Sequence, residues 1–193
     1  MAVAADTIEL DEVTARKLID EQLRRAGWQA DSQALRRSRG TRPQEGRAVA
    51  IAEVPTSSGP VDDVLFVDHD AVAVVEAKRG SVDVPGVLEH QPIRCARDLH
   101  PDLVGRHGPW GEHQVPFTFA TNGRPTLKQV KTKRGVWFRD LRLDTNLTKP
   151  LVGWWTPEGL KAARGGGLHE SGPSLRPCSA VGHEQPLNTA QEV

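Results

Sequence analysis

The chain has 193 residues, and its 25 basic and 25 acidic side chains give a formal net charge of zero at pH 7. This balance excludes a general electrostatic attraction to nucleic acid, and the length suffices for one sizeable core rather than two, although the 37% of apolar residues is low for that length. The sequence lacks a signal-peptide pattern and an apolar run of membrane-spanning length, and Cys95 and Cys178 are too far apart to indicate a disulfide framework. We therefore expect one cytoplasmic domain that does not enter a membrane.

Helix and strand patterns are confined to the first part of the chain. Residues 1–10 have no clear period and are expected to be flexible, whereas residues 11–164 carry nearly all the recognisable elements. Residues 165–193 contain Gly, Pro, Ser and scattered charges without either period, which is typical of disorder. The sequence thus predicts a domain over 11–164 and a disordered tail over 165–193.

The first predicted element is an amphipathic helix over about residues 11–26. Ala15, Ile19 and Leu23 recur at helical spacing along it. Glu12 lies in its first turn, where an acidic side chain favours the positive end of the helix dipole. The same carboxylate could also lean toward a metal site, which makes Glu12 an accessory candidate.

A strand over residues 48–54 and a β-hairpin come next. Residues 64–67 and 71–75 are apolar runs rich in β-branched side chains, and residues 68–70 between them are too polar to bury. Two such runs around a short polar segment are typical of two antiparallel strands joined by a turn.

Charged side chains gather at the open end of this hairpin. Because side chains alternate along a strand, Glu76 and Lys78 share a face, and either Asp62 or Asp63 can lie opposite them on the partner strand. Two converging carboxylates bind a hard cation such as Mg²⁺, and a neighbouring lysine can hold a water or a phosphate. A Glu-x-Lys tripeptide alone is more typical of an exposed strand, but the six acids from Glu53 to Glu76 have no Lys or Arg among them. This local excess of negative charge favours a metal site.

The remaining elements follow in the order helix, strand, strand, helix. Residues 84–99 have a helical pattern interrupted by Pro85 and Pro92, and a proline inside a helix costs about 3 kcal/mol, so we expect a kink or a late start. The later predicted elements are a strand over 117–121, a strand over 135–138 and a helix over 156–163.

Two basic segments flank this acidic region in the sequence. Such segments could hold a DNA backbone on either side of a metal, although solvated loops have the same composition. Their members are Arg36, Arg37, Arg39, Arg42 and Arg47 in the first, and Lys128, Lys131, Lys133, Arg134, Arg139 and Arg142 in the second.

The order of helix, strand, hairpin ending in Glu-x-Lys, helix and strand is that of the PD-(D/E)xK nuclease core. The sequence further resembles the N-terminal nuclease region of a type I restriction enzyme R (motor) subunit. This resemblance implies an α/β fold of the restriction-endonuclease type, with a central mixed sheet flanked by helices. Four blocks carry it in the same order, namely residues 17–28, 73–79, 119–124 and 135–160.

The resemblance also implies roles for particular residues. Asp62, with Asp63 as the alternative, matches the first metal ligand, Glu76 the second, and the Ala77 carbonyl completes the set. Lys78 matches the catalytic lysine. Gln91 takes the Gln place of a Q-x-x-x-Y motif, in which Cys95 stands where Tyr is usual, and Arg94 inside this motif is a further accessory candidate.

The implied function is Mg²⁺-dependent hydrolysis of DNA phosphodiester bonds in a type I restriction system. Methyltransferase and specificity subunits would be the partners, and ATP would be used only by a motor that this chain does not carry, because no G-x-x-x-x-G-K-[ST] loop occurs in it. We therefore expect either a truncated form of a longer subunit with a native tail or a frameshifted form, whose tail would be out of frame.

Two alternatives come from other classes of function. A non-catalytic remnant could bind DNA or assemble with partners without cutting. A metal centre built from His100, His107 and His113 is a weaker alternative, because their spacing fits no standard ligand pattern.

Overall fold

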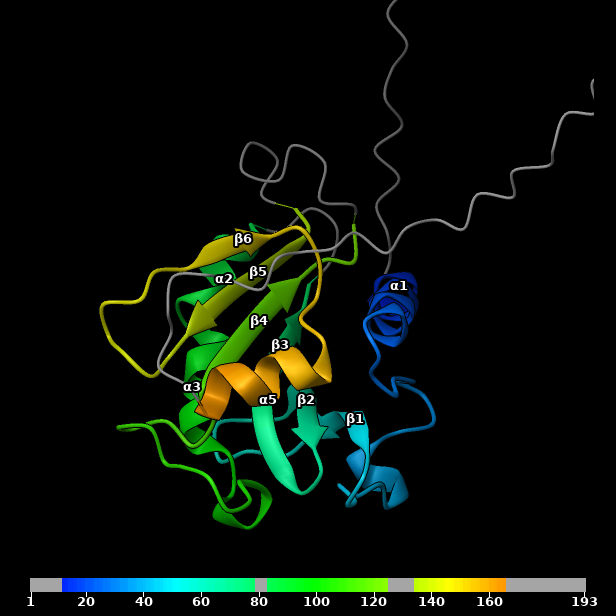
Figure 1. Cartoon of the computed structure of the whole chain (residues 1–193). Helices are drawn as coiled ribbons and strands as arrows, with labels where there is room; N and C mark the ends of the chain where they lie inside the picture. The colour runs from blue at the N-terminus through cyan, green and yellow to red at the C-terminus, as the bar shows by residue number, and fades with distance from the viewer. Residues whose placement is uncertain (1–11, 79–82, 125–133, 166–193) are drawn as a thin grey trace, which may run out of the picture.

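The computed structural model describes residues 12–78, 83–124 and 134–165, and a six-stranded sheet lies at its centre (Figure 1). The strands follow the chain order across the sheet, and within the described residues only β3 and β4 run parallel. The expected mixed α/β architecture is thereby confirmed. The strands are β1 (Ala48–Val54), β2 (Val61–Val67), β3 (Asp70–Ala77), β4 (Phe117–Thr121), β5 (Val136–Asp140) and β6 (Lys149–Leu151).

The predicted hairpin is formed by β2 and β3 and extends a few residues beyond the apolar runs at each end. Its register pairs Val67 with Asp70 at the turn and Asp63 with Val75 near the open end. Asp68 adopts a φ of 56° in the turn, a left-handed conformation that Asp tolerates better than most residues. Because side chains alternate along each strand, one set of apolar residues lies on each face of the sheet.

Helices cover both faces of the sheet (Figure 1). On one face, α1 (Glu12–Arg25) and α5 (Pro157–Gly165) contribute Ile19, Leu23 and Leu160 to the larger core cluster, together with Trp28 and Trp154. Burying each such side chain contributes about 1.5–3 kcal/mol. The predicted amphipathic helix, its apolar positions and the later helix over 156–163 are all confirmed.

On the other face, the helical pattern over 84–99 forms two helices rather than one. They are α2 (Val84–Leu88) and α3 (Gln91–Asp98), and a proline lies in the first turn of each. Proline lacks an N–H, and the first turn of a helix does not need that donor. Pro85 and Pro92 therefore lie in the first turns of two separate helices, where a single helix with a kink or a late start was expected. Cys95 of α3 packs in the second core cluster.

The sequence analysis missed strand β6. This three-residue strand contains Pro150, and it pairs with β5 at the edge of the sheet. A proline normally counts against a strand, because it cannot donate to the ladder, but an edge position does not need that donor. Two short 3-10 turns, Arg37–Arg39 and Pro101–Leu103, lie between the longer elements.

Several expectations fall on residues that the structure does not describe. These are the flexible start over 1–10, the basic residues Lys128, Lys131 and Lys133, and the predicted tail, except for Gly165, which is the last residue of α5. Among the described helices, none is long and apolar enough to cross a membrane.

Candidate functional site

The ends of β2 and β3 bring Asp62 and Glu76 together. The pairing of Asp63 with Val75 places Asp62 across from Glu76, and the Ala77 N–H donates to Asp62 Oδ2 at 2.8 Å. Glu76 is only 2% exposed. Since side chains alternate along β2, Asp63 lies on the other face of the sheet, away from this pair.

Lys78 links this carboxylate pair to α3. Its Nζ donates to Glu76 Oε1 at 2.6 Å and to Gln91 Oε1 at 3.2 Å. The backbone N–H of Lys78 donates to the Thr121 carbonyl at 2.8 Å, which fixes the chain just past the end of β3. The structure thus gathers Asp62, Glu76, Lys78 and Gln91 in one cluster, although they come from three separate elements.

The electrostatics of Glu76 are unusual for a carboxylate. Burial and the negative charge of Asp62 raise the pKa of Glu76 to about 7, against the opposing effect of Lys78. Glu76 Oε2 is buried and accepts no hydrogen bond from the described residues. An unpaired carboxylate oxygen in a buried position is costly, and a bound cation would satisfy it.

Arg16, which was not predicted from the sequence, also contacts the carboxylates of β2. From α1, Arg16 Nη2 donates to Asp62 Oδ1, and Nη1 lies 3.8 Å from Asp63 Oδ2. The side chain of Arg16 is 11% exposed. The apolar period of the helix does not indicate this contact. Two features of the sequence could have suggested it: Arg16 directly follows the buried Ala15, and the acidic segment from Glu53 to Glu76 has no basic residue of its own to balance its charge.

Asp63 is held in a different environment from Asp62. Its side chain is 5% exposed, and burial raises the pKa of Asp63 well above its usual range, with the charge of Arg16 opposing that shift. Arg16 itself loses solvent on burial, but the charges of Asp62 and Asp63 outweigh this effect and raise the pKa of its guanidinium.

Cys95 is buried beside the cluster on α3. Burial and the charge of Glu76 raise the pKa of the Cys95 thiol, so this side chain stays neutral and is a poor nucleophile. It occupies the place expected for a tyrosine and contributes packing there.

The accessory candidates are not part of this cluster as far as the structure describes it. Arg94 lies exposed on α3, and the side chain of Glu12 is outside the described residues. Three members of the two basic segments are engaged in ion pairs. These pairs are Arg36 with Glu53 at 2.9 Å, Arg142 with Asp140 at 2.8 Å, and Arg139 with Glu89.

The histidine alternative is wrong. Within the described ranges, no group of three or more His, Cys, Asp or Glu side chains could hold a metal. His107 instead pairs with Asp70 at 2.9 Å, and the His100 side chain lies against Asp102. The site at Asp62 and Glu76 has two carboxylates, and its third expected ligand is a backbone carbonyl.

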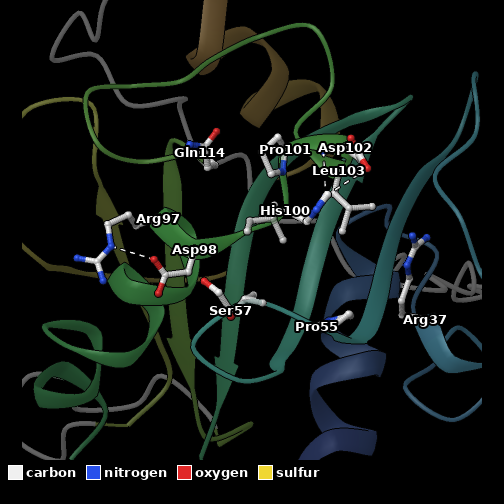
Figure 2. A pocket seen from close by; sticks show the side chains of 12 residues that line it. Arg37, Pro55, Ser57, Arg97, Asp98, His100, Pro101, Asp102, Leu103 and Gln114 are labelled. Atoms are coloured by element: carbon white, nitrogen blue, oxygen red, sulfur yellow. Dashed lines mark hydrogen bonds and ion pairs between the residues drawn. The ribbon is translucent and has the colours of Figure 1, made fainter.

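A cavity of about 610 Å³ lies apart from the carboxylates, between the loop after β1, the end of α3 and the following 3-10 turn (Figure 2). Its charged lining is largely paired internally, with Arg97 bonded to Asp98 at 3.0 Å and His100 to Asp102 at 3.3 Å. Neither Asp62, Glu76 nor Lys78 lines it. A molecule bound in this cavity would therefore not contact Asp62, Glu76 or Lys78.

The fold and this cluster define a mixed α/β domain with two carboxylates and a lysine at the ends of adjacent strands. A family model described as the second domain of the type I restriction enzyme EcoKI endonuclease subunit matches residues 29–163. The chain is also 40% identical, over 183 aligned residues, to the type I restriction enzyme EcoKI endonuclease subunit of Escherichia coli (strain K12). No solved structure matches the chain.

The chain therefore belongs to the family of type I restriction enzyme endonuclease subunits, and the resemblance noted from the sequence is confirmed. The alignment covers 80% of this chain but only 16% of the Escherichia coli subunit.

Proposed function

We propose that the chain is a PD-(D/E)xK nuclease domain that hydrolyses DNA phosphodiester bonds with Mg²⁺. The observation that carries this proposal is the placement of Asp62 across from Glu76, whose Oε1 accepts a hydrogen bond from Lys78 Nζ at 2.6 Å. Membership of an endonuclease-subunit family supports the same reaction.

The residues of the cluster fit Mg²⁺. This hard cation takes oxygen ligands and is usually held by one or two carboxylates. Asp62 and Glu76 would supply them, with the Ala77 carbonyl beside them, and the buried Oε2 of Glu76 has no other partner among the described residues. Asp62 is the better candidate than Asp63, because it is the one that faces Glu76. Bound there, Mg²⁺ would polarise the phosphate and lower the pKa of a water.

The neighbouring side chains have separate roles in this proposal. An ammonium group has three N–H donors, and Lys78 uses two of them on Glu76 and Gln91. The third can orient the attacking water or offset charge that develops on the phosphate. Gln91 is a positioning residue, since its amide oxygen holds the Lys78 ammonium in place.

The proposal is tested by incubating the purified chain with supercoiled plasmid and Mg²⁺. We expect the parent to nick the plasmid, and Lys78→Ala and Glu76→Ala to lower the rate at least about 100-fold, the scale of one lost catalytic group. Lys17→Ala is the matched control, because Lys17 is exposed on α1. Unchanged nicking by Lys78→Ala would contradict the proposed role of the lysine.

A second candidate is a domain that binds DNA or partner subunits without cutting by itself. Cys95 in the place of the usual tyrosine favours it. Methyltransferase and specificity subunits would then be needed for cleavage, and ATP would act only through a motor region. Mg²⁺ binding by a folded chain that does not nick DNA would favour this second function.

A further inference from the structure

Arg16 contacts the carboxylate of Asp62, the proposed first metal ligand. It reaches from α1 to the start of β2, 46 residues away in the sequence, and donates to Asp62 Oδ1. The other oxygen of Asp62 accepts the Ala77 N–H. Both oxygens of the proposed first metal ligand are therefore already engaged within the chain.

A metal ion and this guanidinium cannot both interact freely with Asp62. Two positive groups on one carboxylate repel each other, and the repulsion is strong where the exposed fraction is low, as for Arg16 at 11%. Asp63 offers an alternative partner, since its Oδ2 already lies 3.8 Å from Arg16 Nη1. The guanidinium can thus release Asp62 and still remain beside a carboxylate.

We propose that Arg16 is an internal counter-cation that holds Asp62 when no metal is bound and competes with Mg²⁺ for that carboxylate. This inference rests on the proposed function, because it concerns the same metal site. In the metal-free chain, the charge of Arg16 offsets the repulsion among Asp62, Asp63 and Glu76. Because a metal ion must then displace this charge, Arg16 lowers the affinity of the site for Mg²⁺. A positioning residue that merely prepares Asp62 for metal would have the opposite effect.

The test measures binding of Mg²⁺ alone to the 193-residue chain by isothermal titration calorimetry, together with melting temperatures in EDTA and in Mg²⁺. No DNA is present, so the result does not depend on activity. The variants are Arg16→Met, which removes the charge, and Arg16→Gln, which keeps a neutral donor and guards against a misfolded Met variant. Arg16→Lys keeps the charge, and Arg25→Met removes an arginine of the same helix that is 74% exposed.

We expect Arg16→Met and Arg16→Gln to bind Mg²⁺ at least about tenfold more tightly than the parent, because the repulsion from a largely buried charge is removed. Mg²⁺ should also raise their melting temperatures more than it raises that of the parent. Arg16→Lys should bind nearly as the parent does, and Arg25→Met should be unchanged.

Glu76→Ala distinguishes failure of this inference from failure of the metal site itself. If Glu76→Ala abolishes Mg²⁺ binding while the Arg16 variants bind as the parent does or more weakly, only the competition by Arg16 is overturned. If no variant shows binding that depends on Glu76, the proposed metal site and the inference fall together.

Discussion

The side chain of Glu76 couples the candidate site to the stability of the fold. Burial and the charge of Asp62 raise its pKa to about 7, so the folded state holds its proton more tightly than the unfolded chain. A carboxyl with a raised pKa contributes stability in full below its unfolded pKa of about 4.3, and that contribution is lost as the pH rises through the folded value. The metal-free domain is therefore destabilised by its own site at neutral pH and above.

Glu76→Gln should remove this pH dependence. In EDTA, we expect the free energy of unfolding of the parent, relative to Glu76→Gln, to fall by about 2–3 kcal/mol between about pH 5 and pH 8. Urea unfolding at each pH measures this difference. Glu45→Gln is the control, because the Glu45 side chain is 81% exposed. A constant difference between parent and Glu76→Gln across this range would count against the shifted pKa.

At the scale of elements, α5 is fastened to the turn of the hairpin by two ion pairs of unequal quality. Arg164 Nη1 lies 3.0 Å from Asp70 Oδ2, and the Arg164 side chain is 6% exposed. Lys161 Nζ lies 2.9 Å from Asp68 Oδ2, but the Lys161 side chain is 55% exposed. The same turn and the same helix therefore offer a direct comparison of a buried and an exposed ion pair.

Removing the buried cation should cost more. Arg164→Ala leaves Asp70 short of a partner in a partly buried position, and we expect a loss of about 1–3 kcal/mol in the free energy of unfolding. Lys161→Ala should cost less than Arg164→Ala, because exposed ion pairs contribute little to stability. Urea titration of both variants tests the ranking, and equal losses would show that burial does not set the strength of these contacts.

At the scale of the whole molecule, Trp154 joins segments from both ends of the described chain. Its ring packs on Phe119 with centroids 5.2 Å apart, and its Nε1 donates to Gln22 Oε1 of α1 at 3.1 Å. Gln22 in turn donates to the Gly123 carbonyl at 2.8 Å. The segment before α5, helix α1 and the end of β4 are thereby held around one indole ring.

Trp154→Ala should loosen this assembly. Large-to-small changes of a buried aromatic residue cost about 3–5 kcal/mol, and the Gln22 amide would lose a partner as well. Thermal and urea unfolding should both report the loss. Trp110→Ala, in the loop before β4, is the comparison, because Trp110 is only partly buried and lies outside the main cores. Equal effects of the two changes would contradict the central place given to Trp154.

Local sequence signals predicted much of this fold, and contacts between distant segments account for the rest. The expected strands over 48–54 and 117–121 match β1 and β4 to the residue, because β-branched and aromatic runs there are bounded by clear turn residues. Strand β6 was not predicted because it contains Pro150. A strand tolerates a proline at the edge of a sheet, and the local sequence does not reveal that β6 lies at an edge.

The same distinction applies to the candidate site. The hairpin period alone was enough to predict that Glu76, Lys78 and an aspartate of the partner strand would meet. It could not choose between Asp62 and Asp63, because that choice depends on the register of the hairpin. Arg16 was missed because its contact joins a helix and a strand that have no common local pattern.

Strand β6 also decides how this sheet can meet other chains. A sheet edge normally presents a row of free N–H and C=O groups onto which a foreign strand can add, and this is a common route to aggregation. Here that edge is three residues long, has a proline at its centre, and begins with an exposed lysine. Strand addition is therefore disfavoured at the β6 edge, and intermolecular contacts on this side of the domain should use helices and loops instead of extending the sheet.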